Sequence, residues 1–392
     1  MFLNKQNFKN RVLQIFILIF VINILLYAKI VISAAQKGLL LWFNTVLPSL
    51  FPFFIGTQFM IDFGLVQWIG YLFEPIMKPL FKIPGVGAFA LIMGMMSGYP
   101  MGATITANLV KKGDLTSIEG QRLLSVCNQS GPLFILGVVS VGMLKQPSIG
   151  FYLLIIQYLS AFSTGLIFRF YKNSDQAKKI ITTKNNKTKT GFPSLGETLK
   201  KSVTYAMELL LQIGGFIILF SVIIELLKHG PISSIFNSFF TLIDKWIPLH
   251  KELKTAFLFS ILEITNGIQI ISTTSAPILQ KLICINGCIA WSGFSVHAQT
   301  ASILQGTSLK TSIYIISKLI QSVLAIIYTF LLFPLIRKNI LNSTFSVPST
   351  ILQQENVGYP IFIHSTFQFV VLCIILVILG LLYYYLLSPR NS

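Results

Sequence analysis

The stretch Ser97-Gly98-Tyr99-Pro100-Met101-Gly102 decides the fold, because it places glycine, proline and polar residues between two apolar runs. A second stretch of this kind, Asn128-Gln129-Ser130-Gly131-Pro132, follows in the first half of the chain. The second half contains Glu263-Ile264-Thr265-Asn266-Gly267 and then Trp291-Ser292-Gly293-Phe294-Ser295-Val296-His297. Inside a bilayer, unwound backbone survives only where protein buries it or a cavity hydrates it. Two breaks in each half therefore predict a central binding site, as in secondary transporters built from repeats.

The composition is that of a membrane protein. Of the 392 residues, 54% are hydrophobic and 11% are charged, whereas soluble domains carry roughly 25% charged residues. The net charge of +18 comes from lysines and arginines that lie mostly in predicted loops, where they orient the chain and contact anionic lipid. The lipid bilayer is thus an expected partner, and nucleic acid is not. The four cysteines form no CxxC pair, so no zinc site or disulfide framework is indicated, and no cofactor is expected.

Landmarks in the two halves recur at a nearly fixed offset. Gly102 and Gly267 are 165 residues apart, and Gly131 and Gly293 are 162 residues apart, so an internal duplication is the simplest explanation. The predicted segments are an N-terminal transmembrane helix in residues 1–35, a first repeat in 36–171, a basic cytoplasmic linker in 172–202, a second repeat in 203–337, and a polar loop with a C-terminal transmembrane helix in 338–392.

Counting the crossings predicts that the repeats are inverted. If the N-terminus is cytoplasmic and each hairpin returns to its own side, the first repeat enters from outside and the second from the cytoplasm. We expect an all-α polytopic membrane protein with two inverted repeats, re-entrant hairpins, broken transmembrane helices and about eight full spans. The hairpins should turn at Gly98-Tyr99-Pro100 and around Thr265-Asn266-Gly267. Both termini and residues 172–201 then face the cytoplasm, as the positive-inside rule favours.

Three runs resemble those of a known family. They are Gly94-Met95-Met96-Ser97-Gly98-Tyr99-Pro100-Met101-Gly102-Ala103, Cys127-Asn128-Gln129-Ser130-Gly131-Pro132-Leu133-Phe134 and Ser292-Gly293-Phe294-Ser295-Val296-His297-Ala298-Gln299. The family is that of the sporulation integral membrane proteins of the YlbJ or SpoVV type, which belongs with the nucleoside-recognition Gate domains and is related to concentrative nucleoside transporters. The resemblance covers most of residues 36–337. It implies that dipicolinic acid is carried across the outer forespore membrane during sporulation.

A small anionic metabolite such as dipicolinate needs donors for two carboxylates and an apolar surface for its ring. The start of a half-helix offers free N–H groups and a positive dipole end, and Tyr99 and Phe294 are candidates to flank the ring. The predicted substrate-binding residues are the polar residues and glycines at the four breaks: Ser97, Gly98, Tyr99, Gly102, Asn128, Ser130, Gly131, Glu263, Thr265, Asn266, Gly267, Ser292, Gly293, Ser295, His297 and Gln299.

Ionisable residues at membrane depth are costly, at least ~2.5–3.5 kcal/mol at the centre of a helix, and are usually functional or paired. Glu263 either carries a proton, binds a cation or holds the hairpin tip through backbone N–H groups. His297 either takes part in proton coupling or is a neutral hydrogen-bonded side chain. Lys318 either neutralises substrate charge or pairs with Glu208.

Other function classes stay open. Transport of a nucleoside or another small metabolite would use the same architecture; fixed positive charge near the tips would favour an anion, and paired carboxylates would favour a nucleoside. A non-transporting sporulation scaffold would leave the duplicated breaks unexplained, and a homo-oligomer is compatible with each class. Catalysis is not expected, because the Gly293-Phe294-Ser295-Val296-His297 stretch lacks the final glycine and the preceding strand of a nucleophile elbow.

Overall fold

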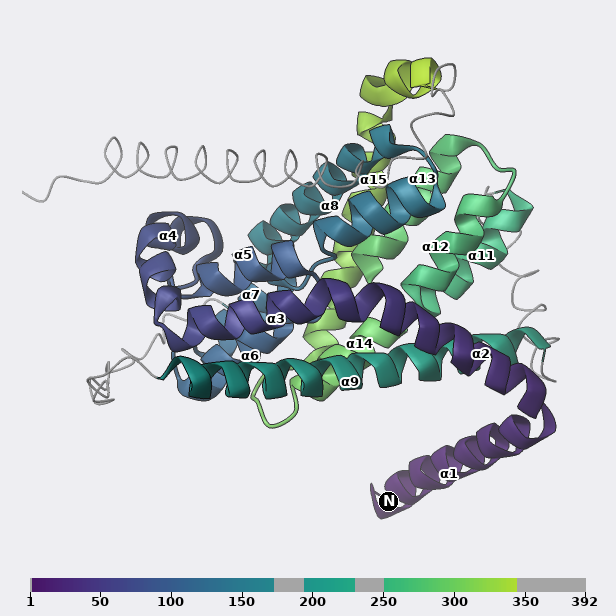
Figure 1. Cartoon of the computed structure of the whole chain (residues 1–392), viewed down its shortest axis with the longest axis horizontal. Coiled ribbons are helices and arrows are strands. Elements are labelled where there is room, and N and C mark those ends of the chain that lie inside the picture. Colours follow the sequence, from purple (N-terminus) through teal and green to yellow (C-terminus); the bar gives the residue numbers. More distant parts are fainter. Residues whose placement is uncertain (1, 173–193, 230–249, 344–392) are drawn as a thin grey trace, which may run out of the picture.

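A computed structural model describes residues 2–172, 194–229 and 250–343, and every regular element in them is a helix (Figure 1). The first half contains α1 (Phe2–Leu26), α2 (Ala28–Leu41), η1 (Trp42–Val46), α3 (Leu47–Asp62), α4 (Leu65–Phe81), α5 (Gly87–Ser97), α6 (Met101–Lys112), α7 (Ser117–Cys127), η2 (Leu133–Met143) and α8 (Pro147–Phe168). The second half contains α9 (Leu195–His229), α11 (Lys251–Leu262), α12 (Ile264–Thr273), α13 (Ile278–Trp291), α14 (Gly293–Ile303) and α15 (Thr311–Ser343). The predicted all-α class is confirmed.

Several helices match the length and hydropathy of a membrane span. Within the described residues, Pro147–Phe168, Leu195–Lys228 and Thr311–Leu335 are each long and apolar enough to cross a bilayer. Ile17–Leu26 and Ala28–Asn44 together pass the same test, although they are bent by 98°. The predicted C-terminal helix lies outside the described residues. The total of about eight spans stays a prediction.

The order of elements is the same in the two halves. The first half has the short helices α5 and α6, then the broken pair α7 and η2, then the long helix α8. The second half has α11 and α12, then α13 and α14, then α15. Within each half the two short helices pack against each other as a helical hairpin. This order is what a duplication would produce, while the inverted orientation stays a prediction.

Two predicted boundaries were wrong. The second hairpin turns at Glu263, so Thr265, Asn266 and Gly267 lie in the first turn of α12 instead of in an unwound tip. The predicted linker ends early, because α9 begins at Leu195. The Ser194 hydroxyl accepts a hydrogen bond from the backbone N–H of Glu197 at 3.3 Å, which caps the start of α9.

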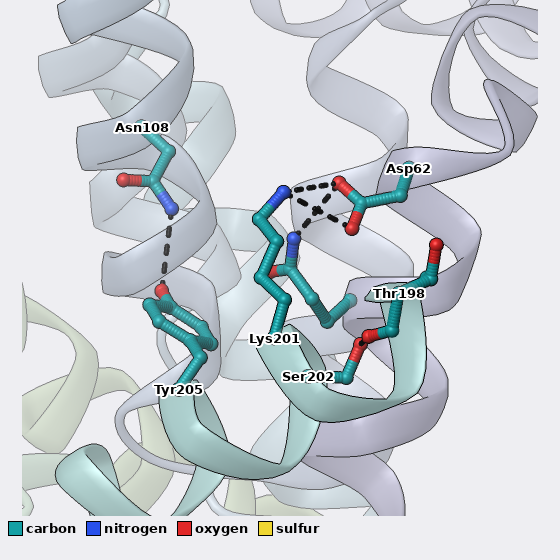
Figure 2. Close-up of polar contacts among 7 residues, drawn as sticks. Asp62, Asn108, Thr198, Lys201, Ser202 and Tyr205 are labelled. Carbon is teal, nitrogen blue, oxygen red and sulfur yellow. Dashed lines mark hydrogen bonds and ion pairs between the residues drawn. The ribbon is translucent and has the colours of Figure 1, made fainter. Parts of the chain in front are cut away.

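The long helix α9 runs beside α2 and α3 and joins them to the first hairpin (Figure 1). Lys201 of α9 pairs with Asp62 at the end of α3, with 2.9 Å between Nζ and Oδ1 (Figure 2). One turn further along α9, the Tyr205 hydroxyl accepts a hydrogen bond from Asn108 of α6 at 3.3 Å (Figure 2). The start of α9 therefore holds α3 and α6 together at one end of the molecule.

The two halves also exchange contacts through their long helices α8 and α15, which pack against each other. Gln157 of α8 donates to the carbonyl oxygen of Asn286 in α13 at 2.8 Å. Gln321 of α15 donates to the side-chain oxygen of Gln129, which follows α7, at 2.7 Å. Each long helix thus hydrogen-bonds to the broken pair of the other half, and this exchange places the four breaks near one another.

Candidate functional site

The four breaks surround one cavity of about 200 Å³. Nine of the sixteen predicted site residues line it: Ser97, Gly98, Tyr99, Ser130, Gly131, Glu263, Thr265, Ser295 and Gln299. The rest of its wall is largely apolar and includes Val46 and Leu50 before and within α3, Leu154 and Tyr158 of α8, and Ile213 and Ile217 of α9. An apolar pocket with a few converging polar groups is the usual form of a small-molecule site.

Two helices begin at the cavity with no side chain capping their first turn. Ser130, Gly131, Pro132 and Leu133 line it where η2 begins, and no side-chain hydrogen bond caps that helix at Pro132. Ser295 and Val296 line it where α14 begins, and that helix also lacks a side-chain cap at Ser292. The first N–H groups of a helix have no partner within the helix and lie at its positive dipole end. These two helix starts can therefore bind a negatively charged group of a ligand in the cavity.

Ser97 is an independent indication of a ligand. Its side chain lines the cavity and is only 6% exposed. Its hydroxyl has no hydrogen-bond partner among the described residues. A buried hydroxyl without a partner carries a free-energy cost, and an acceptor on a bound ligand would remove that cost.

Glu263 serves a structural purpose in the conformation described. Its two carboxylate oxygens accept hydrogen bonds from the backbone N–H groups of Thr265 at 3.0 Å and Asn266 at 2.7 Å. The carboxylate thus caps α12, which was one of the three roles considered for it. Because these N–H groups are occupied, α12 differs from η2 and α14 in having a side-chain cap at its start.

The other seven predicted residues do not line the cavity; they are Gly102, Asn128, Asn266, Gly267, Ser292, Gly293 and His297. Asn128 instead joins the halves, since its side-chain nitrogen donates to the Tyr314 hydroxyl at 2.8 Å. Ser292 donates to the Tyr99 hydroxyl at 2.8 Å, and that hydroxyl donates to the carbonyl of Ile289 at 2.9 Å. These contacts fix the first hairpin tip against the break in the second half.

Tyr99 and Phe294, the two residues expected to flank the ring of a ligand, lie in different environments. Tyr99 lines the cavity, as expected for a residue that flanks a ring, but Phe294 does not and is 43% exposed. The His297 ring lies among Trp291, Phe294 and Tyr314, with 4.4 Å between the His297 and Trp291 ring centroids. Both imidazole nitrogens are buried and have no hydrogen bond of ordinary geometry to the described residues.

Gly293 shows why a break of this kind contains glycine. Its φ is +79°, and a Cβ atom there would lie 3.2 Å from the backbone nitrogen of Ile264. A side chain would thus strain the backbone and press on the start of α12. Gly293 allows the second break to lie directly against the tip of its own hairpin.

The environment of Lys318 differs most from the one that the sequence predicted. It is fully buried on α15, whereas Glu208 is exposed, and the expected ion pair between them is not formed. Its ammonium donates to Gln321 at 2.9 Å, and Gln321 in turn bonds to Gln129. Gln321 thus connects a buried lysine to the first break, a contact that no sequence pattern indicated.

The fold is that of a helical membrane protein with a cavity at its broken helices. The family model described as "Nucleoside recognition" (Gate) matches residues 43–172. The chain is 37% identical over 318 residues to the sporulation integral membrane protein YlbJ of Bacillus subtilis strain 168, which covers 76% of this chain and 77% of that protein. The chain belongs to the family of sporulation integral membrane proteins of the YlbJ type.

More distant relatives match shorter segments. The inner membrane protein YjiG of Escherichia coli K12 is 32% identical over 95 residues, which is 24% of this chain and 60% of that protein. An uncharacterized protein of Alkalihalophilus pseudofirmus is 29% identical over 97 residues, 25% of this chain and 21% of that protein. No solved structure matches the chain. The names of YlbJ and YjiG describe membrane proteins and not enzymes.

Proposed function

We propose that this protein is a secondary transporter that carries dipicolinic acid across the outer forespore membrane during sporulation. The observation that carries the proposal is a cavity lined by residues from all four breaks, at which two helices begin without side-chain caps. Soluble anions bind to such helix starts without a fixed countercharge. A site formed jointly by two similar halves also suits alternating access, in which one half moves relative to the other.

The size and lining of the cavity favour a single aromatic ring. A dry cavity of about 150 Å³ can hold benzene, so about 200 Å³ leaves space for a ring with small substituents. The apolar wall formed by Ile213, Ile217 and Tyr158 would contact the ring. The starts of η2 and α14, together with Ser97, would bind the carboxylates. Dipicolinate has these parts in one flat molecule.

A nucleoside is the second candidate, and the description of the matching family model favours it. Glu263 at the cavity would suit a neutral ligand with hydroxyl groups, because a carboxylate accepts hydrogen bonds from them. Against this, Glu263 is already engaged with Thr265 and Asn266, and no second carboxylate lines the cavity among the described residues. A sporulation scaffold without transport activity would have no use for a cavity in which polar groups of all four breaks converge.

The proposed topology has inverted repeats, two re-entrant hairpins and about eight spans, with both termini and residues 172–201 in the cytoplasm. Lys111 and Lys112 at the end of α6 would lie on the same face. The paired Lys201 and Asp62 would also lie there, at the cytoplasmic end of α9 (Figure 2). Positive charge concentrated on one face is the arrangement that the positive-inside rule favours.

Deletion of the gene in its spore-forming host tests the proposal in cells. Cells without the protein should still synthesise dipicolinic acid in the mother cell and should form spores deficient in it. A Gly131→Val variant should reproduce the defect while still reaching the membrane, because a Cβ at this position would lie 3.1 Å from the backbone of Ser97. Spores of normal dipicolinic acid content from the deletion strain would refute the proposed substrate.

A further inference from the structure

The most unusual charge in the described part of the chain is Lys318. It is 0% exposed in α15, and no carboxylate of a described residue lies within ion-pair distance of it. Its Nζ atom has one hydrogen bond, to Gln321 Oε1 at 2.9 Å. A buried charge is costly unless it is paired, and inside a membrane such charges are typically functional.

The surroundings of Lys318 connect it to the cavity. Its ammonium lies 5.5 Å from the centre of the Tyr99 ring and 5.9 Å from that of Tyr314, which is within the range of cation–π contacts. Tyr99 lines the cavity, whereas Lys318 does not. Through Gln321, Lys318 is also hydrogen-bonded to Gln129, the residue before the cavity-lining Ser130. The ammonium is therefore close to both breaks of the first half: it lies beside the Tyr99 ring at the hairpin tip, and through Gln321 it is connected to Gln129 in the break after α7.

We propose that Lys318 is the residue that makes the cavity select anionic ligands, because its ammonium acts across the Tyr99 ring as a positive charge that the ligand itself does not contact. This inference rests on the proposed function. A ligand against Tyr99 would lie within about 10 Å of the ammonium, where one unit charge at an effective dielectric constant of about 20 changes affinity roughly tenfold per ligand charge. The buried position also protects this attraction from screening by salt.

Glu263 is the charged residue that lines the cavity in the described part of the chain, and the helix start that it caps partly compensates its negative charge. The Glu263 carboxylate is stabilised by the N–H groups of Thr265 and Asn266 at the positive end of α12. Lys318 has no comparable compensation, because its described polar contact is one amide oxygen. An anionic ligand would supply the missing negative charge while it is bound.

The test compares three ligands of similar shape and different charge in vesicles containing the purified full chain. They are dipicolinate with two carboxylates, picolinate with one, and the neutral diamide of dipicolinic acid. We expect Lys318→Met to raise the KM for dipicolinate roughly a hundredfold and for picolinate roughly tenfold, and to leave that for the diamide unchanged. Lys318→Arg should keep the wild-type order of preference. The same ratios should hold in low and in high salt.

Two controls make the result specific. Lys310→Met removes an exposed lysine just before α15 and should leave all three KM values unchanged. Folding is followed by the Tm of the detergent-solubilised protein, and Lys318→Met should not lower it, since replacing an unpaired buried charge with an apolar side chain is seldom destabilising.

The experiment distinguishes failure of the inference about Lys318 from failure of the proposed function. An equal loss for all three ligands in Lys318→Met would overturn the inference and leave the proposed function standing, because Lys318 would then be structural. A wild-type KM for the diamide equal to that for dipicolinate would overturn the inference in the same way, because the cavity would then not select by charge. Wild-type protein that takes up uridine alone, or none of these compounds, would overturn the proposed function and the inference with it.

Discussion

At the scale of single residues, the candidate site contains one buried hydroxyl and two helix starts for which the described residues provide no side-chain partner. Ser97 has a buried hydroxyl without a partner, and the starts of η2 and α14 have no side-chain cap. Glu263 is the contrasting case, because two backbone N–H groups already engage its carboxylate. A group that has no partner in the protein can bind a ligand without first breaking a hydrogen bond. A substitution of Ser97 should therefore change ligand affinity without changing the stability of the fold.

Ser97→Ala should weaken substrate binding without loss of stability. The lost hydroxyl makes no hydrogen bond within the described protein, so Tm should be unchanged. A hydrogen bond to a charged ligand group should be lost, which raises the KM for dipicolinate roughly tenfold. Ser125→Ala is the matched control, since the Ser125 hydroxyl donates to the Arg122 carbonyl at 2.6 Å and does not line the cavity. It should lower Tm and leave KM unchanged; an unchanged KM in Ser97→Ala would argue against the site.

At the scale of elements, the sequence predicted the hairpins and broken helices because glycine and proline act locally. The break after α7 and the turn after α5 lie where the Gly and Pro residues are. The position of the second turn was predicted a few residues too late, around Thr265-Asn266-Gly267. The chain turns at Glu263 because the carboxylate of this residue caps α12. The partners of Lys318 and of Gln129 were not predictable from local sequence, since α15 is far from α7 along the chain.

Gly102→Ala and Gly267→Ala should both destabilise the protein, because these two positions in the two hairpins allow equally close packing. A Cβ on Gly102 would lie 2.3 Å from the Cys127 carbonyl oxygen, and one on Gly267 would lie 2.2 Å from the Ser260 Cα. Overpacking of this kind costs about 1–3 kcal/mol or more. Gly215→Ala in α9 is the control, since its Cβ would meet no atom within 4 Å. It should be neutral or stabilising, and thermal unfolding in detergent measures all three. Equal Tm values for the three variants would contradict the packing described.

At the scale of the whole molecule, the two halves meet through exchanged contacts. Gln157 hydrogen-bonds to Asn286 of the other half, Gln321 to Gln129, and Tyr99 to Ile289. Of the described spans, α8 and α15 pack against each other and against the broken helices, and α9 packs along α2 and α3. In the proposed transport cycle, one half would shift against the other around the cavity that they share. Orientation in the membrane is the part of the account that depends on the charge distribution of the loops.

The inverted topology predicts opposite locations for two loops. Single cysteines replacing Ser174 and Ser349, in a background without the native cysteines, should react with an impermeant reagent from opposite sides of the membrane. Ser174 should be labelled from the cytoplasmic side, because it lies in the basic linker. Labelling of both positions from one side would exclude the proposed inversion.

Uptake by purified protein in sealed vesicles tests the central claim most directly. Vesicles that contain the wild-type chain are supplied with labelled dipicolinate or labelled uridine, and empty vesicles and vesicles with Gly131→Val give the background. The account predicts saturable uptake of dipicolinate by the wild type, little uptake of uridine, and background values for the variant. Uptake of uridine with exclusion of dipicolinate would transfer the assignment to nucleosides, and background values for both compounds would contradict the claim that this protein is a transporter of either.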